Sequence, residues 1–142
     1  MREEVRQLAC GVPREKLWDF LADYDNVVRL GAPDASAHLA TGSAQTGDSV
    51  YEAELSWYGS VSHFTAHLAS ASRPTTLTWD TTTGMGRSWL RFDLEPAQSS
   101  TVVSVTLHHD GSESARVLEA LAWGILQTTL ERTLIGLSEL QL

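Results

Sequence analysis

The sequence predicts an α+β fold in which a curved seven-stranded antiparallel sheet surrounds a long C-terminal helix, with two short helices after the first strand. Three observations support this fold class. Apolar residues recur at helical spacing within residues 12–30, they alternate with period two over residues 35–110, and from there to residue 142 no strong helix breaker occurs. Strands and helices in this order are typical of α+β architectures.

The first strand is expected over residues 2–12, where apolar side chains alternate loosely with polar ones. Pro13 ends it and suits the first position of a helix, because its missing N–H would have no partner there. The helix that follows is amphipathic, and its apolar side consists of Leu17, Phe20, Leu21 and Tyr24. Asp25-Asn26 is expected to interrupt it before a second helical turn over residues 27–30.

Residues 35–110 should form a meander of about six strands with one apolar face, because turn clusters separate segments of alternating polarity. The parity that we assign to the inner face carries five aromatic residues: Tyr51, Trp57, Phe64, Trp79 and Phe92. Aromatic side chains on such a face either fill a core or line a cavity for a flat apolar ligand.

The last helix is expected to begin at Asp110, because Glu113 three residues later completes a pattern similar to a capping box. One apolar stripe of this helix consists of Trp123, Leu126, Leu130, Leu134 and Leu137. The other consists of Val117, Leu118, Leu121, Ile125 and Ile135. The sheet can cover only one stripe, so we expect the other to form an interface, most simply in a homodimer.

The composition and net charge disfavour some classes of binding partner. The 142 residues carry 18 acidic and 10 basic side chains, and the net charge of −8 disfavours nucleic acid and anionic membranes. Cys10, the single cysteine, cannot form an internal disulfide. We expect one domain over residues 1–142, located in the cytoplasm and without integral membrane association, because the sequence has neither a signal peptide nor a stretch of about 18 apolar residues.

The segment VPREKLWDFLADYDNVVRL, residues 12–30, resembles the opening of the START-like superfamily, which is also called SRPBCC or the helix-grip fold. The polyketide cyclase/dehydrase branch is the most similar. Further matching features are the Gly47-Asp48 turn, the Arg73-Pro74 turn with Leu77-Thr78-Trp79 after it, and the closing segment over residues 130–140. These motifs are structural and contain no catalytic signature.

The resemblance implies an elongated internal cavity for a hydrophobic small molecule. We therefore expect a polyketide cyclase/dehydrase-like enzyme of secondary metabolism, and the alternative is a non-catalytic protein that binds or transfers a lipid, isoprenoid or quinone. A third hypothesis, favoured only by a closed cavity, is a regulatory module that binds a partner protein. The candidate ligand-binding residues are Tyr24, Trp57, Phe64, Trp79, Phe92, Leu121 and Ile125. Plain core packing is the alternative for each of them.

If the protein is an enzyme, His109 is the candidate catalytic residue, because it has inward parity and an imidazole titrates near neutral pH. The Tyr51 hydroxyl is a second candidate proton donor, and a purely structural histidine is the alternative. Arg132, on the second stripe, either binds a ligand carboxylate or enolate or pairs across an interface. His63 and His67 would lie about 13 Å apart on a strand, so we expect no metal site and no cofactor.

Overall fold

The computed structural model describes residues 2–43, 47–57, 60–83, 86–111 and 116–142, and for residues 57, 111, 116–119 and 121 it describes the backbone alone. The helices are α1 (Arg14–Leu21), α2 (Tyr24–Gly31) and α3 (Arg116–Ser138). The strands are β1 (Arg2–Cys10), β2 (Ser36–Thr41), β3 (Val50–Trp57), β4 (Ser60–Ser72), β5 (Thr76–Thr83), β6 (Gly86–Ala97) and β7 (Ser100–Gly111).

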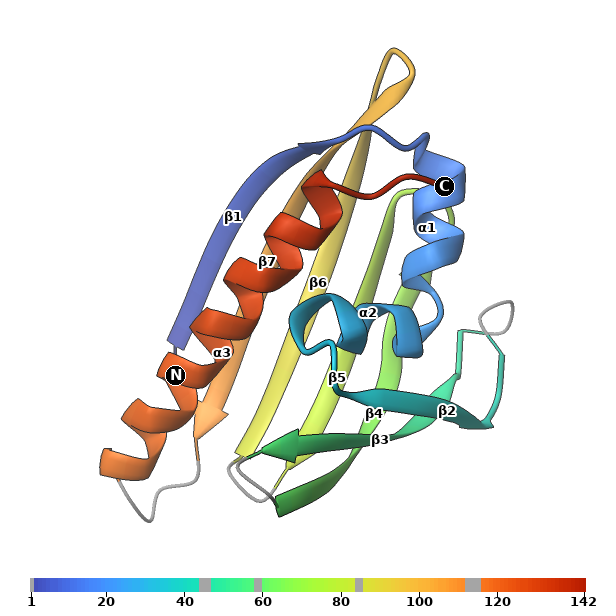
Figure 1. The fold of residues 1–142 in the computed structure, drawn as a ribbon. Coiled ribbons are helices and arrows are strands. Elements are labelled where there is room, and N and C mark those ends of the chain that lie inside the picture. Colours follow the sequence, from blue (N-terminus) through green and yellow to red (C-terminus); the bar gives the residue numbers. More distant parts are fainter. Residues whose placement is uncertain (1, 44–46, 58–59, 84–85, 112–115) are drawn as a thin grey trace.

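The strands form one seven-stranded antiparallel sheet in the order β1-β7-β6-β5-β4-β3-β2. Each strand from β2 to β7 pairs with its neighbour in sequence, and β1 closes the order by pairing with β7. The sheet curves around α3, and α1 and α2 lie on the same face as α3 (Figure 1). The predicted fold class is therefore confirmed.

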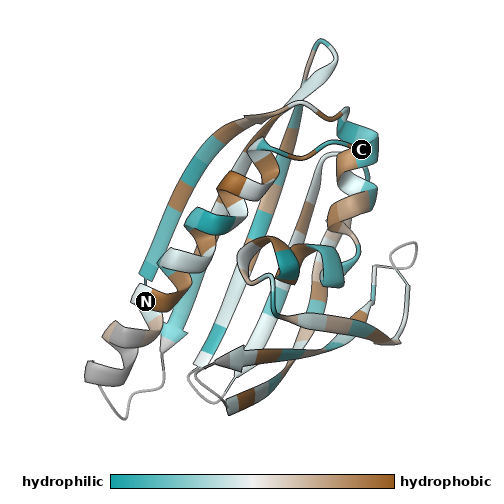
Figure 2. Ribbon diagram, viewed as in Figure 1, coloured by the Kyte–Doolittle hydropathy of each residue, from teal (hydrophilic) through white to brown (hydrophobic). Residues whose placement is uncertain are grey.

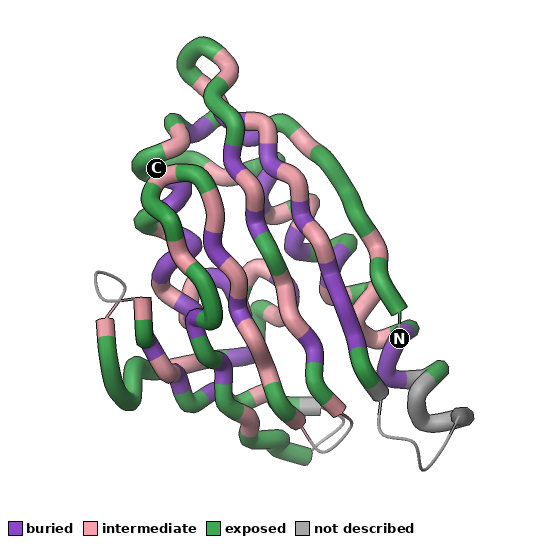
Figure 3. Tube along the Cα trace, turned by 180° about the vertical axis from the view of Figure 1, so that it is seen from behind, coloured by how far each residue is buried: buried purple, intermediate pink, exposed green. Residues whose placement is uncertain are grey.

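The core lies between the concave face of the sheet and the helices. Hydrophobic and hydrophilic residues alternate along the strands (Figure 2), and buried and exposed residues do the same when the sheet is viewed from behind (Figure 3). The concave side is filled by Leu68, Leu77, Trp79, Phe92, Leu94, Val103 and Val105, all of which are buried. The first apolar stripe of α3 completes the core, because Trp123, Leu130 and Leu137 belong to the same cluster.

The short helices begin and end at residues that differ slightly from the prediction. Pro13 is the N-cap of α1 and not its first helical residue. The break between α1 and α2 lies at Ala22 and Asp23 and not at Asp25-Asn26, because the Asp23 carboxylate caps α2 by accepting a hydrogen bond of 3.1 Å from the Asp25 N–H. Asp25 and Asn26 are therefore inside α2.

The predicted start of the last helix is wrong. Asp110 belongs to β7, where it pairs with Arg87 of β6, and α3 begins at Arg116. The long β6–β7 ladder continues to Gly86 and Gly111 and takes up Asp110, so that residue cannot cap a helix. Glu113, the other half of the expected capping box, lies outside the described residues.

Candidate functional site

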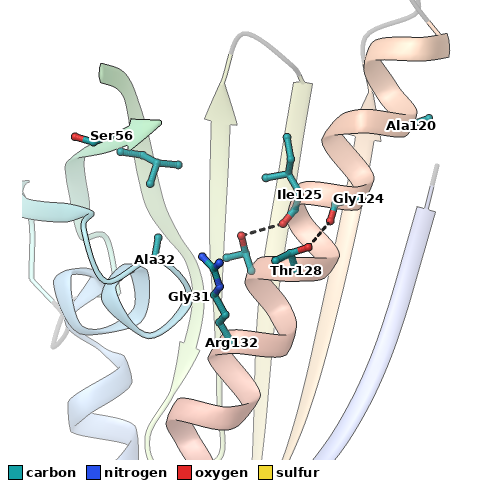
Figure 4. A pocket seen from close by; sticks show the side chains of 10 residues that line it. Gly31, Ala32, Ser56, Ala120, Gly124, Ile125, Thr128 and Arg132 are labelled. Carbon is teal, nitrogen blue, oxygen red and sulfur yellow. Dashed lines mark hydrogen bonds between the residues drawn. The ribbon is translucent and has the colours of Figure 1, made fainter. Parts of the chain in front are cut away.

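A groove of about 550 Å³ opens between α3, the C-terminal end of α2 and the end of β3 (Figure 4). This volume falls within the roughly 300–1,000 Å³ of typical small-molecule sites. The groove is lined by Gly31, Ala32, Leu55, Ser56, Ala120, Gly124, Ile125, Thr128, Thr129 and Arg132. Six of these ten residues belong to α3, and the other four belong to the segments that face it.

The floor of the groove is a row of residues spaced by four on α3: Ala120, Gly124, Thr128 and Arg132. Residues four apart lie on the same side of a helix, so the row follows the helix axis. Its first two members have almost no side chain, and a Cβ added at Gly124 would meet no atom within 4 Å. The space is open because the helix presents small residues there.

One side of the groove is closed by a tight approach of α2 to α3. A Cβ on Gly31 would overlap the Thr129 methyl group, and it would lie 2.9 Å from Thr133 Oγ1 and 3.2 Å from the Thr129 carbonyl oxygen. Such distances leave no room for a side chain. Glycine at position 31 therefore allows the end of α2 to rest directly on α3.

The threonine hydroxyls of the groove are already used as donors. Thr128 Oγ1 donates to the Gly124 carbonyl at 3.0 Å, and Thr129 Oγ1 donates to the Ile125 carbonyl at 3.0 Å. Each hydroxyl oxygen can still accept a hydrogen bond from a ligand. None of the lining residues carries a carboxylate, and Arg132 is the one charged residue among them.

Behind the groove, between the sheet and α3, lies an inner cavity of about 90 Å³. Thr129 lines both spaces and so lies between them. The inner cavity has room for a few water molecules but is too small for a drug-sized ligand. Its lining includes Tyr24, Trp79, Thr81 and Ser88.

An aromatic cluster lies on the concave side next to this cavity. The Tyr24 ring lies 5.0 Å from the Trp79 ring, 6.2 Å from that of Tyr51 and 6.4 Å from that of Phe64, measured between centroids. Trp79 and Tyr51 meet edge to face at 5.5 Å. The Trp79 indole N–H also donates to the Leu21 carbonyl at 2.9 Å, which connects the cluster to α1. The rings pack on one another, as in a core.

The two tyrosines of this cluster stay protonated at neutral pH. Burial raises the pKa of Tyr51 to about 12, with further contributions from the charge and hydrogen bonding of Asp23. Burial alone raises the pKa of Tyr24 well above its usual range. These hydroxyls can donate a hydrogen bond but do not act as bases.

His109 is buried next to Ser88, which lines the inner cavity, and only 2% of His109 is exposed. Its Nδ1 lies 3.3 Å from the Ser88 hydroxyl, and Thr81 Oγ1 donates to the Ser88 carbonyl at 3.3 Å. The three residues are neighbours across β5, β6 and β7. His109 is therefore near the inner cavity through Ser88, and it does not line the groove.

The predicted ligand residues divide between the two spaces and the core. Ile125 lines the groove, Tyr24 and Trp79 line the inner cavity, and Phe92 is fully buried. Phe64 is half-buried beside Tyr24, and the side chains of Trp57 and Leu121 lie outside those described.

Sequence reasoning missed the small residues of the groove: Gly31, Gly124, Thr128 and Thr129. One signal was present, because Ala120, Gly124 and Thr128 recur every four residues in an otherwise apolar helix.

Two kinds of feature are absent from the part of the chain that the structure describes: a metal-binding cluster and a membrane-spanning helix. Within that part of the chain no group of three His, Cys, Asp or Glu side chains could hold a metal ion. In the same part, none of the helices is long and apolar enough to cross a membrane.

No protein-family model matches the sequence, and no curated protein matches it significantly. Solved structures do match. The Zhui aromatase/cyclase from Streptomyces sp. R1128 superposes with a TM-score of 0.78 at 10% identity, over 96% of this chain and 90% of that chain. A START superfamily protein from Mycobacterium smegmatis superposes with a TM-score of 0.72 at 12% identity, over 98% of this chain and 99% of that chain.

The di-domain ARO/CYC StfQ from the steffimycin biosynthetic pathway also matches, with a TM-score of 0.68 at 9% identity over 96% of this chain and 50% of that chain. At these identities the matches concern the fold. The chain has the helix-grip fold of START-like proteins, as the sequence predicts.

Proposed function

We propose that this protein binds an elongated hydrophobic small molecule in the groove between α2, β3 and α3. The observation that carries the proposal is an open volume of about 550 Å³ whose floor consists largely of small residues, beside a concave face on which Leu77, Trp79 and Phe92 are fully buried. An apolar ligand placed there would cover Ile125 and Leu55 and remove their surface from water. The chemical classes that fit are a polyketide chain, an isoprenoid, a lipid and a quinone.

Binding can be tested with N-phenyl-1-naphthylamine, an uncharged apolar probe whose fluorescence rises in a dry site. Wild-type protein should bind it, and Gly124→Phe should weaken binding at least about 10-fold, because the added ring fills the floor of the groove. Gly124→Ala is the matched control and should retain binding, since a single Cβ meets no atom within 4 Å. Equal affinity of Gly124→Phe and wild type would exclude the groove as the site.

A second candidate function is a polyketide cyclase/aromatase-like activity. It is favoured by the Ser88–His109 pair beside the inner cavity, and the names of two matched structures, an aromatase/cyclase and an ARO/CYC, agree with it. In this mechanism the Ser88 hydroxyl, which lines the inner cavity, relays a proton between an enolising carbon and the imidazole of His109. The Tyr51 hydroxyl lines neither the groove nor the inner cavity and is hydrogen-bonded to Asp23, so it has no direct part in this step. The reacting part of the substrate must then pass Thr129 into the inner cavity.

This activity is tested by turnover of a poly-β-ketone substrate. His109→Ala should lower the rate about 100-fold while substrate affinity stays near the wild-type value. Full activity of His109→Ala would exclude the imidazole as the proton carrier. If wild-type protein binds such a substrate without converting it, the protein is a carrier and not an enzyme.

A further inference from the structure

We infer that the ligand carries an anionic carboxylate-type head group and that Arg132 binds it at the α2 end of the groove. This inference rests on the proposed function, because it assumes that the groove is the ligand site. It specifies the chemistry of one end of the ligand.

Arg132 differs in its ionic contacts from five other arginines of the protein. Five other arginines form ion pairs with carboxylates: Arg6 with Glu131, Arg29 with Asp25, Arg73 with Asp19, Arg87 with Asp80, and Arg91 with Asp93. Arg132 forms no ion pair with any residue that the structure describes. Glu131, its neighbour in sequence, lies 2.9 Å from Arg6.

The Arg132 side chain is directed toward the groove (Figure 4). Arg132 extends from α3 toward α2 and β3, on the side of the helix that faces the groove (Figure 4). A guanidinium group presents a planar fork of N–H donors that matches a carboxylate in two parallel hydrogen bonds.

Few hydrogen-bond donors in the described lining of the groove remain for a ligand. Thr128 and Thr129 have donated their hydroxyl hydrogens to α3, and the Ala32 N–H donates to the Val28 carbonyl at 2.9 Å. Among the side chains that line the groove, Arg132 and the Ser56 hydroxyl remain as donors. An anionic oxygen therefore finds its strong partner at Arg132, whereas a ligand hydroxyl can donate to the threonine oxygens elsewhere.

The net charge of the whole protein also affects which ligands it binds. A net charge of −8 opposes the approach of an anion, so any preference for an anionic ligand must come from a local cation. None of the described lining residues is acidic, and the guanidinium is not offset within the groove.

The positions on α3 also define the orientation of the ligand. Ala120 and Arg132 lie about 18 Å apart along a helix that rises about 1.5 Å per residue. The small residues between them accommodate an apolar body, and Arg132 marks the end where the head group lies. The expected ligand is thus elongated, apolar over most of its length and acidic at one end.

The test compares decanoate with 1-decanol at pH 8, each measured by displacement of N-phenyl-1-naphthylamine. The two compounds share an apolar chain and differ in the charge of the head group. Wild-type protein should bind decanoate more tightly than 1-decanol. Arg132→Gln should weaken this preference, so that the decanol Kd divided by the decanoate Kd falls about 5- to 10-fold. Arg132→Lys should restore part of the preference, because it keeps the charge but loses the planar fork.

Arg91→Gln is the matched control, because it removes the same charge from an exposed arginine outside the groove. It should keep the wild-type ratio. An unchanged ratio in Arg132→Gln, or an equal loss in Arg91→Gln, would overturn the role of Arg132 while leaving the groove as the binding site. Failure of wild-type protein to bind the naphthylamine probe would instead overturn the proposed function, and the inference with it.

Discussion

Replacing Gly31 with alanine tests how closely α2 approaches α3. The new Cβ would overlap the Thr129 methyl group and lie 3.2 Å from the Thr129 carbonyl oxygen. A threonine in a helix has little rotamer freedom and a carbonyl oxygen has none, so the helices themselves must separate. Overpacking of this kind costs about 1–3 kcal/mol. We expect Gly31→Ala to lower the free energy of unfolding by that amount.

Gly124→Ala is the matched control for this experiment, because its Cβ would meet no atom within 4 Å. It should raise the free energy of unfolding by up to about 1 kcal/mol, since alanine is the better helix former. Urea unfolding followed by circular dichroism measures both variants. If Gly31→Ala is as stable as Gly124→Ala, α2 does not rest directly on α3, and the wall of the groove has been misplaced.

Two further predictions concern the core and the pH dependence of stability. Trp18→Ala should lower the free energy of unfolding by about 3–5 kcal/mol, because Trp18 is buried and its indole N–H donates to the Thr76 carbonyl at 3.0 Å. A urea unfolding midpoint close to that of wild type would contradict this prediction. Because burial raises the pKa of Tyr51 to about 12 in the folded protein, a tyrosine in the unfolded chain ionises first as the pH rises. The contribution of Tyr51 to the free energy of unfolding is therefore complete below about pH 10 and should be lost between about pH 10 and about pH 12. Tyr51→Phe should therefore lose stability less steeply over this range, and equal slopes in urea unfolding would show that Tyr51 ionises normally.

The fold could be predicted because each segment has a clear period. The period-two alternation of residues 35–110 gave the meander, and the helical spacing of Leu17 and Leu21 gave the first helix. The start of the last helix could not be predicted in this way. The β6–β7 ladder continues past Asp110, and ladder length is a property of strand pairing that local capping patterns do not contain.

The site was less accessible to sequence analysis than the fold. Parity placed Tyr51, Trp79 and Phe92 on the concave face, but parity does not say whether such a face is filled or open. That depends on how the rings of Tyr24, Tyr51 and Trp79 meet in space. The groove depends on the approach of Gly31 to α3, which joins two segments far apart in the chain.

The described members of the second apolar stripe of α3 are divided between the groove and the exposed surface. Ile125 lines the groove, and Ile135 is 55% exposed. The side chains of Leu118 and Leu121 lie outside those described. The homodimer thus stays a prediction, and sedimentation at about 100 μM would test it.

The central claim is that the groove is the ligand site, and an NMR titration with N-phenyl-1-naphthylamine tests it most directly. Backbone amide shifts report where the probe binds, without any substitution in the protein. We expect the largest shifts at Gly31, Gly124 and Thr128, with Arg91 on β6, outside the groove, unaffected. Shifts concentrated instead at the cleft between Val12 and the C-terminal residues, or on the outer face of the sheet, would contradict the account.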